Sequence, residues 1–86
     1  MAEMKVSVRL FAILRDRAGR GCIDIRLPER ATVADALDVL GQHGDLAEAL
    51  ARIPVRMAVN REYADPATEL HAGDELALIT PISGGA

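Results

Sequence analysis

Residues 5–27 read KVSVRLFAILRDRAGRGCIDIRL and contain two runs in which apolar and other side chains alternate. In residues 5–14 the even positions are all apolar, and Phe11 falls on the opposite face, because successive side chains of a strand point to opposite faces of a sheet. Residues 22–27 alternate in the same way, and two glycines lie between the runs. This pattern predicts two antiparallel strands joined by a loop longer than the tightest hairpin turn.

Two short helices are expected in the middle of the chain. Thr32 is a typical helix N-cap, whose hydroxyl can accept a hydrogen bond from the amide of Asp35, and residues 32–40 carry one apolar helical stripe. Residues 45–53 carry a second stripe that ends before Pro54. Neither helix is long enough to be stable alone, so both must pack on the sheet.

The second half of the chain predicts three more strands. They are residues 55–60, a brief edge strand near Tyr63, and residues 75–80, where pairing ends at Pro81 because proline has no amide hydrogen. A right-handed crossover would make the strands before and after the helices parallel neighbours. We therefore predict an α+β ubiquitin-like β-grasp domain over residues 1–81, with a mixed sheet packed on one main helix and a short second helix. A flexible Gly-Gly tail, residues 82–86, would follow.

Composition limits the kinds of function. The chain has 86 residues, half of them apolar, and its only aromatic residues are Phe11 and Tyr63. It is long enough for one modest aliphatic core and too apolar to be disordered. A net charge of −3 without a basic stripe argues against a nucleic-acid partner. The sequence has no membrane-spanning run and no signal-peptide pattern, so we expect a cytoplasmic protein without a membrane partner.

Few residues have the spacing of a catalytic or metal site. Cys22 is the only cysteine, which excludes an internal disulfide and a cysteine-based metal cage. His43 and His71 lack the spacing of known ligand motifs, and no nucleophile–histidine constellation or phosphate-binding loop is present. We expect that the chain binds no metal, is not an enzyme on its own, and functions at its surface or a terminus.

Four segments together resemble one family over nearly the whole chain. They are KVSVRLFAILRDRAG at residues 5–19, TVADALDVL at 32–40, MAVNREY at 57–63 and GDELALITPISGG at 73–85. In order and spacing they resemble the small subunit of molybdopterin synthase, a ubiquitin-like sulfur carrier of the MoaD/ThiS type.

The resemblance implies a sulfur-transfer function. An E1-like activating enzyme would use ATP and Mg²⁺ to adenylate the terminal carboxylate of Gly85, and a sulfur donor would convert it to a thiocarboxylate. The carrier would then dock with the large synthase subunit in a heterotetramer and supply dithiolene sulfur to the pyranopterin precursor of molybdenum cofactor. This chain itself would bind no cofactor.

The tail residues suit that chemistry. Gly84 and Gly85 have no Cβ, so the backbone can enter a narrow channel. Pro81 would direct the chain off the sheet, and Ile82 and Ser83 would enter the partner with the glycines.

Alternation also predicts a docking surface. Phe11, Ile79 and Tyr63 would lie on the sheet face opposite the helices, where an exposed apolar cluster indicates an interface. The family uses apolar side chains at matching positions to bind the large subunit. The alternative is a small second core or edge packing. Arg15, at the end of the first predicted strand, matches a family arginine that would contact the activating enzyme, or else it is simply solvated.

The sequence departs from the family at its last residue, because Ala86 follows the second glycine. Three explanations are open. A peptidase removes Ala86 to expose Gly85, the partners tolerate the extra residue, or this chain is an inactive or divergent paralogue. We favour removal by a peptidase.

Other functions share the same tail chemistry. The chain could carry sulfur for thiamine, cysteine or tRNA thiolation, and the tail alone does not choose between these pathways. In a different class, it could be a noncatalytic ubiquitin-like interaction module, or a protein modifier joined to lysines through Gly85.

Overall fold

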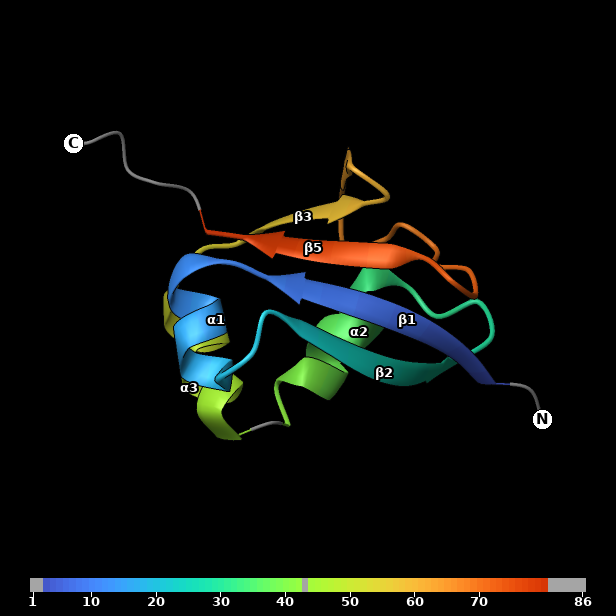
Figure 1. Cartoon of the computed structure of the whole chain (residues 1–86). Helices are drawn as coiled ribbons and strands as arrows, with labels where there is room; N and C mark the ends of the chain where they lie inside the picture. Colours follow the sequence, from blue (N-terminus) through green and yellow to red (C-terminus); the bar gives the residue numbers. More distant parts are fainter. Residues whose placement is uncertain (1–2, 43, 81–86) are drawn as a thin grey trace.

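A computed structural model describes residues 3–42 and 44–80, which form one twisted five-stranded sheet with helices on one face (Figure 1). In chain order the elements are β1 (Glu3–Leu10), α1 (Ala12–Ala18), β2 (Cys22–Pro28), α2 (Val33–Leu40), α3 (Gly44–Arg52), β3 (Arg56–Val59), β4 (Glu62–Ala64) and β5 (Glu75–Ile79). The strands lie in the order β2-β1-β5-β3-β4. The predicted mixed sheet of a β-grasp fold is confirmed.

Strand β1 is paired on both sides. It runs antiparallel to β2, with Val6 opposite Ile25, as the alternating runs predicted. It runs parallel to β5, with Val8 opposite Leu76. Because a parallel pair needs a long crossover, the segment between β2 and β5 returns across one face of the sheet, and it carries α2 and α3.

The prediction that the first strand extends to residue 14 is wrong. Strand β1 ends at Leu10, Phe11 is extended, and α1 begins at Ala12, whose φ is 51°. The helix ends at Gly19, which has a φ of 77° and donates its amide to the Arg15 carbonyl oxygen. A short apolar run fits a strand and a helix equally well. Here the helical turn places Leu14 in the core with no exposed surface.

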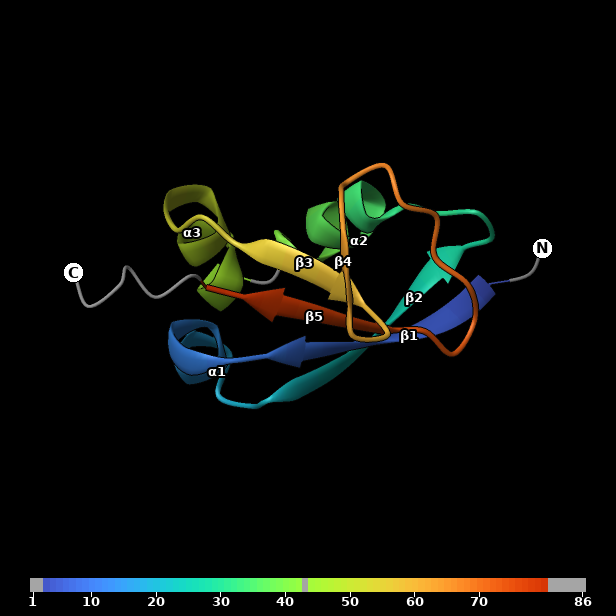
Figure 2. The same ribbon diagram turned by 90° about the horizontal axis from the view of Figure 1, so that it is seen from above.

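Helix α1 packs against α3 at the end of the sheet where β5 finishes, and α2 lies nearer the other end (Figure 2). An exposed ion pair joins α1 and α3, with Arg17 Nη1 3.9 Å from Glu48 Oε1. Arg15 was predicted at the end of a strand, but it lies on α1, where its side chain is exposed. None of the helices in the described residues is long and apolar enough to cross a membrane.

The predicted cap of the main helix is confirmed. The hydroxyl of Thr32 accepts a hydrogen bond from the Asp35 amide at 3.4 Å, and the Asp35 carboxylate accepts one from the Thr32 amide at 2.9 Å. This reciprocal capping box satisfies amides that the first turn of α2 leaves without partners.

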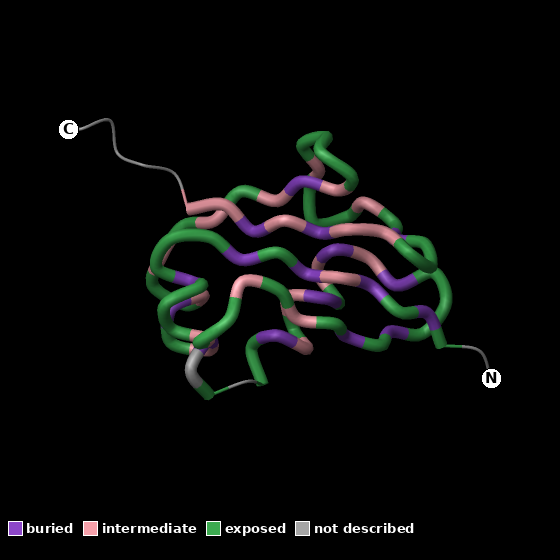
Figure 3. The backbone as a smooth tube through the Cα atoms, viewed as in Figure 1, coloured by how far each residue is buried: buried purple, intermediate pink, exposed green. Residues whose placement is uncertain are grey.

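The core lies between the sheet and the three helices. Buried residues alternate along β1 (Figure 3), and no polar or charged residue of the described chain is buried. The completely buried side chains are aliphatic: Leu10, Leu14, Leu27, Leu40, Leu46, Leu70, Leu76, Leu78, Val6, Val8 and Val33. An aliphatic core was predicted from the composition, and it uses only the helix-covered face of the sheet.

The packing of α1 can be tested with two neighbouring residues. Leu14→Ala should lower the free energy of unfolding by about 2–5 kcal/mol, because it removes buried methyl groups and leaves a cavity. Ile13→Ala, at a side chain that is 39% exposed, should cost only about 0.5 kcal/mol. Urea unfolding of the two variants checks the difference, and equal losses would show that α1 does not pack as described.

Candidate functional site

The face of the sheet opposite the helices is open. The strand registers place one row of residues across all five strands on this face: Cys22, Arg9, Ala77, Ala58 and Tyr63. The third and fourth positions, on β5 and β3, are alanines, whose small side chains leave a depression in the row. Larger side chains around them form the sides of a hollow.

The hollow has a volume of about 440 Å³ and is lined by Arg9, Phe11, Ala58, Arg61, Tyr63, Glu75, Ala77 and Ile79. Phe11 is 40% exposed and Tyr63 is 76% exposed, although both are large and largely apolar. Exposed aromatic surface beside a concave apolar floor is typical of a protein-binding site, where aromatic side chains contribute strongly to affinity. We call this feature the sheet hollow.

Charged groups border the sheet hollow. Arg9 Nη1 lies 3.4 Å from Glu75 Oε2, and the Arg9 guanidinium carbon lies 5.9 Å from the centroid of the Phe11 ring. Both charged side chains are exposed, so each contact contributes at most about 1 kcal/mol to stability. Their arrangement provides a polar rim around an apolar centre, which is the usual anatomy of a protein interface.

A tight turn holds one side of the sheet hollow in place. Asn60 and Arg61 join β3 to β4 with φ values of 51° and 73°, as a two-residue type I′ turn requires. The Asn60 side chain donates to Asp74 Oδ1 and accepts from the Glu75 amide, both at 3.0 Å. These bonds fix the turn to the start of β5 and so position the residues of β4 beside the hollow.

Three of the predicted docking residues do come together. Phe11, Tyr63 and Ile79 all line the sheet hollow, although they come from the end of β1, from β4 and from β5. Arg15 does not line it. That these residues bind a partner stays a prediction, since the structure contains this chain alone.

The predicted tail residues lie outside the described part of the chain. They are Pro81, Ile82, Ser83, Gly84 and Gly85, together with Ala86. The described chain ends at Thr80, directly after Ile79. The segment that carries the two glycines is therefore joined covalently to a strand that lines the sheet hollow.

Sequence reasoning missed the floor and rim of the sheet hollow. Ala58 and Ala77 come together only through the β3–β5 register, in which they are partners. Arg9 and Glu75 are 66 positions apart in sequence. Alternation alone could have placed each residue on the outer face, but not beside the others.

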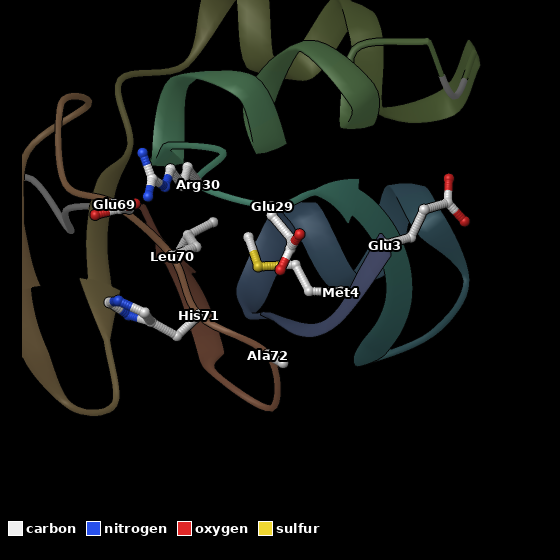
Figure 4. Close-up of a pocket in the computed structure, with 8 residues that line it drawn as sticks. All are labelled: Glu3, Met4, Glu29, Arg30, Glu69, Leu70, His71 and Ala72. Atoms are coloured by element: carbon white, nitrogen blue, oxygen red, sulfur yellow. The ribbon is translucent and has the colours of Figure 1, made fainter. Parts of the chain in front are cut away.

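A second hollow, of about 790 Å³, lies at the other end of the sheet, around the start of β1 (Figure 4). Its lining includes the charged residues Glu3, Glu29, Arg30 and Glu69. In Figure 4 the Glu3 side chain points away from the others, so the acids do not converge on one point. Within the described residues, no group of His, Cys, Asp and Glu could hold a metal ion.

Comparison with known proteins settles the family. The model of the ThiS family matches residues 8–85, which includes both the sheet hollow and the two glycines. The chain belongs to the ThiS family. The family resemblance predicted from the sequence, to ubiquitin-like sulfur carriers, is thereby confirmed.

Two relatives of this ThiS-family chain are named for different functions, one as a sulfur carrier and one as a modifier. The molybdopterin synthase sulfur carrier subunit of Arabidopsis thaliana is 33% identical over 84 residues, covering 98% of this chain and 86% of the relative. Small archaeal modifier protein 1 of Haloferax volcanii is 41% identical over 86 residues, covering 90% and 97%.

Solved structures confirm the fold. A crystal structure of the Haloferax volcanii modifier superposes with a TM-score of 0.82 at 31% identity, covering 92% of this chain and 99% of that one. A chain in the complex of subunits 1 and 2 of molybdopterin-converting factor from Helicobacter pylori superposes with a TM-score of 0.70 at 25% identity, covering 95% and 100%. The matched Helicobacter pylori structure is a complex of two different subunits.

The strain in the turn beside the sheet hollow provides a test of its geometry. Arg61→Gly should raise the free energy of unfolding by about 0.5–1 kcal/mol, because glycine adopts a positive φ without the steric penalty of a Cβ. Arg61→Ala keeps that penalty and should give no gain. Thermal unfolding of the two variants checks the prediction, and equal stability would mean that the turn does not have positive φ at this position.

Proposed function

We propose that this chain is the sulfur-donating small subunit of a molybdopterin synthase, whose terminal Gly85 is adenylated, thiocarboxylated and presented to the large subunit. The observation that carries the proposal is the covalent continuity between β5, which lines the sheet hollow, and the segment that contains Gly84 and Gly85. One partner can therefore hold the body at the hollow while it receives the terminus.

The length of residues 81–85 allows one partner to bind both the sheet hollow and the terminus. Five residues separate Thr80 from the carboxylate of Gly85 when Gly85 itself is counted, and fully extended they span at most about 17 Å. A terminus on a tether of that length can enter a partner's pocket while the sheet hollow stays bound outside. The two glycines keep the end of the tether narrow, since neither has a side chain.

The chemistry requires activation by another protein. A carboxylate is a poor electrophile, so one of its oxygens first attacks the α-phosphorus of ATP, and pyrophosphate leaves. Hydrosulfide (HS⁻) then attacks the carbonyl carbon of the acyl-adenylate, the bond from that carbon to the phosphate oxygen breaks, AMP leaves, and the terminus becomes a thiocarboxylate. The E1-like activating enzyme would hold ATP and Mg²⁺, which stabilises the charge on the phosphates, and a sulfur donor would supply the nucleophile.

The position of the reacting carbon makes Ala86 important. Adenylation of Ala86 would extend the tether by about 3.3 Å and put a methyl group beside the carbonyl, and a displacement of about 1 Å can already cost a large factor in rate. We propose that a peptidase removes Ala86 before activation. The same requirement applies to every pathway that uses Gly85.

The names of the relatives support two different functions. The Arabidopsis carrier subunit and the Helicobacter complex are both named for molybdopterin, which supports a second synthase subunit as the partner of this chain. The higher identity to small archaeal modifier protein 1 favours a second candidate function, a modifier joined to lysines through Gly85. Sulfur transfer for thiamine, cysteine or tRNA thiolation uses the same tail.

Docking through the sheet hollow can be tested with two matched variants. Phe11→Lys should weaken binding to the large synthase subunit at least about tenfold, because truncating or charging a central aromatic contact is costly. Ile13→Lys is the control, since Ile13 is as exposed as Phe11 at 39% against 40% but does not line the hollow. Titration calorimetry measures both affinities, and equal affinities would exclude the hollow as the docking site.

Intact mass distinguishes a sulfur carrier from a protein modifier and tests the role of Ala86. Protein ending at Gly85 and protein ending at Ala86 are each incubated with ATP, the activating enzyme and a sulfur source. The Gly85 form should gain the mass expected when one oxygen is exchanged for sulfur, and the Ala86 form should not. Gel ladders of lysine conjugates without a thiocarboxylate would favour the modifier instead, and thiocarboxylation of the Ala86 form would contradict the need for a peptidase.

A further inference from the structure

The first observation concerns the free edge of the sheet at β2. Strand β2 is the outermost strand next to β1, and its seven residues, Cys22–Pro28, make it longer than β4, the other edge strand, which has three. A long edge with unpaired backbone groups is a template for another strand. Pro28 blocks pairing at the end of β2 because it has no amide hydrogen, and the exposed charges of Asp24 and Arg26 disfavour any partner strand that does not complement them.

The register shows which backbone groups face this edge. The Leu10 amide donates to the Gly21 carbonyl oxygen at 2.9 Å, so Gly21 directs its backbone groups toward β1. In an antiparallel ladder this orientation alternates, and Ile23 and Ile25 therefore also face β1. The amides and carbonyl oxygens of Asp24 and Arg26 point to the open edge.

The side chains of the same two residues carry opposite charges on the outer face. Asp24 and Arg26 are both exposed. Asp24 already forms an ion pair with Lys5, with Oδ2 3.4 Å from Nζ, and it accepts a hydrogen bond from Ser7. Arg26 is the register partner of Lys5, so two positive side chains lie opposite each other. Like charges in this position are unfavourable, and a carboxylate on the open side of Arg26 would offset the repulsion.

We propose that β2 pairs antiparallel with β2 of a second copy of this chain, about a two-fold axis at Ile25. In this register Asp24 lies opposite Arg26 of the second copy, and Arg26 lies opposite its Asp24. Both pairs exchange backbone hydrogen bonds through the groups that face the edge, and both bring opposite charges together. A contact of this kind is isologous, so it closes as a dimer with one continuous sheet.

The neighbouring symmetric registers bring like charges together. A two-fold axis at Asp24 would place two carboxylates directly opposite each other, and an axis at Arg26 would do the same with two guanidinium groups. The Ile25 register is the one in which the charges alternate. On the inner face it sets Ile25 against its own copy and Ile23 against Leu27, which are all apolar.

The proposed dimer is independent of the proposed function. The sheet hollow is lined by residues of β1, β3, β4 and β5, the turn between β3 and β4, and Phe11. Pairing through β2 therefore leaves the sheet hollow of each copy uncovered. Interfaces made by one strand pair are small, and we therefore expect a weak, concentration-dependent dimer that lengthens the sheet without blocking a docked partner.

The charge pattern allows a swap experiment with purified full-length protein. Asp24→Arg and Arg26→Asp should each weaken self-association at least about tenfold, because each creates two like-charge pairs across the axis. The double variant Asp24→Arg with Arg26→Asp restores opposite charges and should dimerise again. An equimolar mixture of the two single variants should form mixed dimers.

Sedimentation velocity over a concentration series up to about 1 mM measures the association, and thermal unfolding shows that each variant is folded. Glu62→Arg is the control, because it makes the same charge change on the opposite edge strand, β4, and should leave self-association unchanged. A monomeric wild type throughout the series would overturn the proposal. So would a dimer that the single variants do not weaken, or a double variant that remains monomeric.

Discussion

The parallel pairing of β1 with β5 is the constraint on which the rest of this structure depends. Val8 pairs with Leu76 and Leu10 with Leu78, and all four are buried at 2% exposure or less. Parallel neighbours cannot be joined by a hairpin, so the intervening chain must cross one face of the sheet and bury its apolar helical stripes there. The opposite face is left open, and it carries the sheet hollow.

The same pairing places the functional parts together. Because β1 and β5 run in the same direction, they finish at the same end of the sheet, where Phe11 and Ile79 both line the sheet hollow. The two alanines behind them form its floor, and the turn at Asn60 fixes its other side to the start of β5. A chain of this length has only one modest core and little free energy with which to form a deep cavity, and its sheet hollow lies on an outer sheet face.

The two edge strands of the sheet differ in length and in charge. Strand β4 is a short edge, whereas β2 is long and has alternating charges on its outer face. The proposed self-pairing at β2 and the proposed partner binding at the sheet hollow would use separate strands, so the two contacts are compatible in one chain. The strand order alone makes this separation possible, because β1 lies between β2 and the strands β5 and β3, which carry the two alanines of the floor.

The sequence by itself determined the strand pairing of β1 with β2, the capping box of α2, the aliphatic core and the family, because these follow from local periodicity, cap chemistry and the order of four segments. It also placed Phe11, Tyr63 and Ile79 on the outer face. It did not reveal α1, since the run from Ala12 to Leu14 fits a strand or a helical turn, and only burial against the core chose the helix. The sheet hollow, its rim and the position of β2 at an open edge were decided by tertiary structure alone, because each depends on which strands lie side by side, and that is set by contacts between residues far apart in the chain.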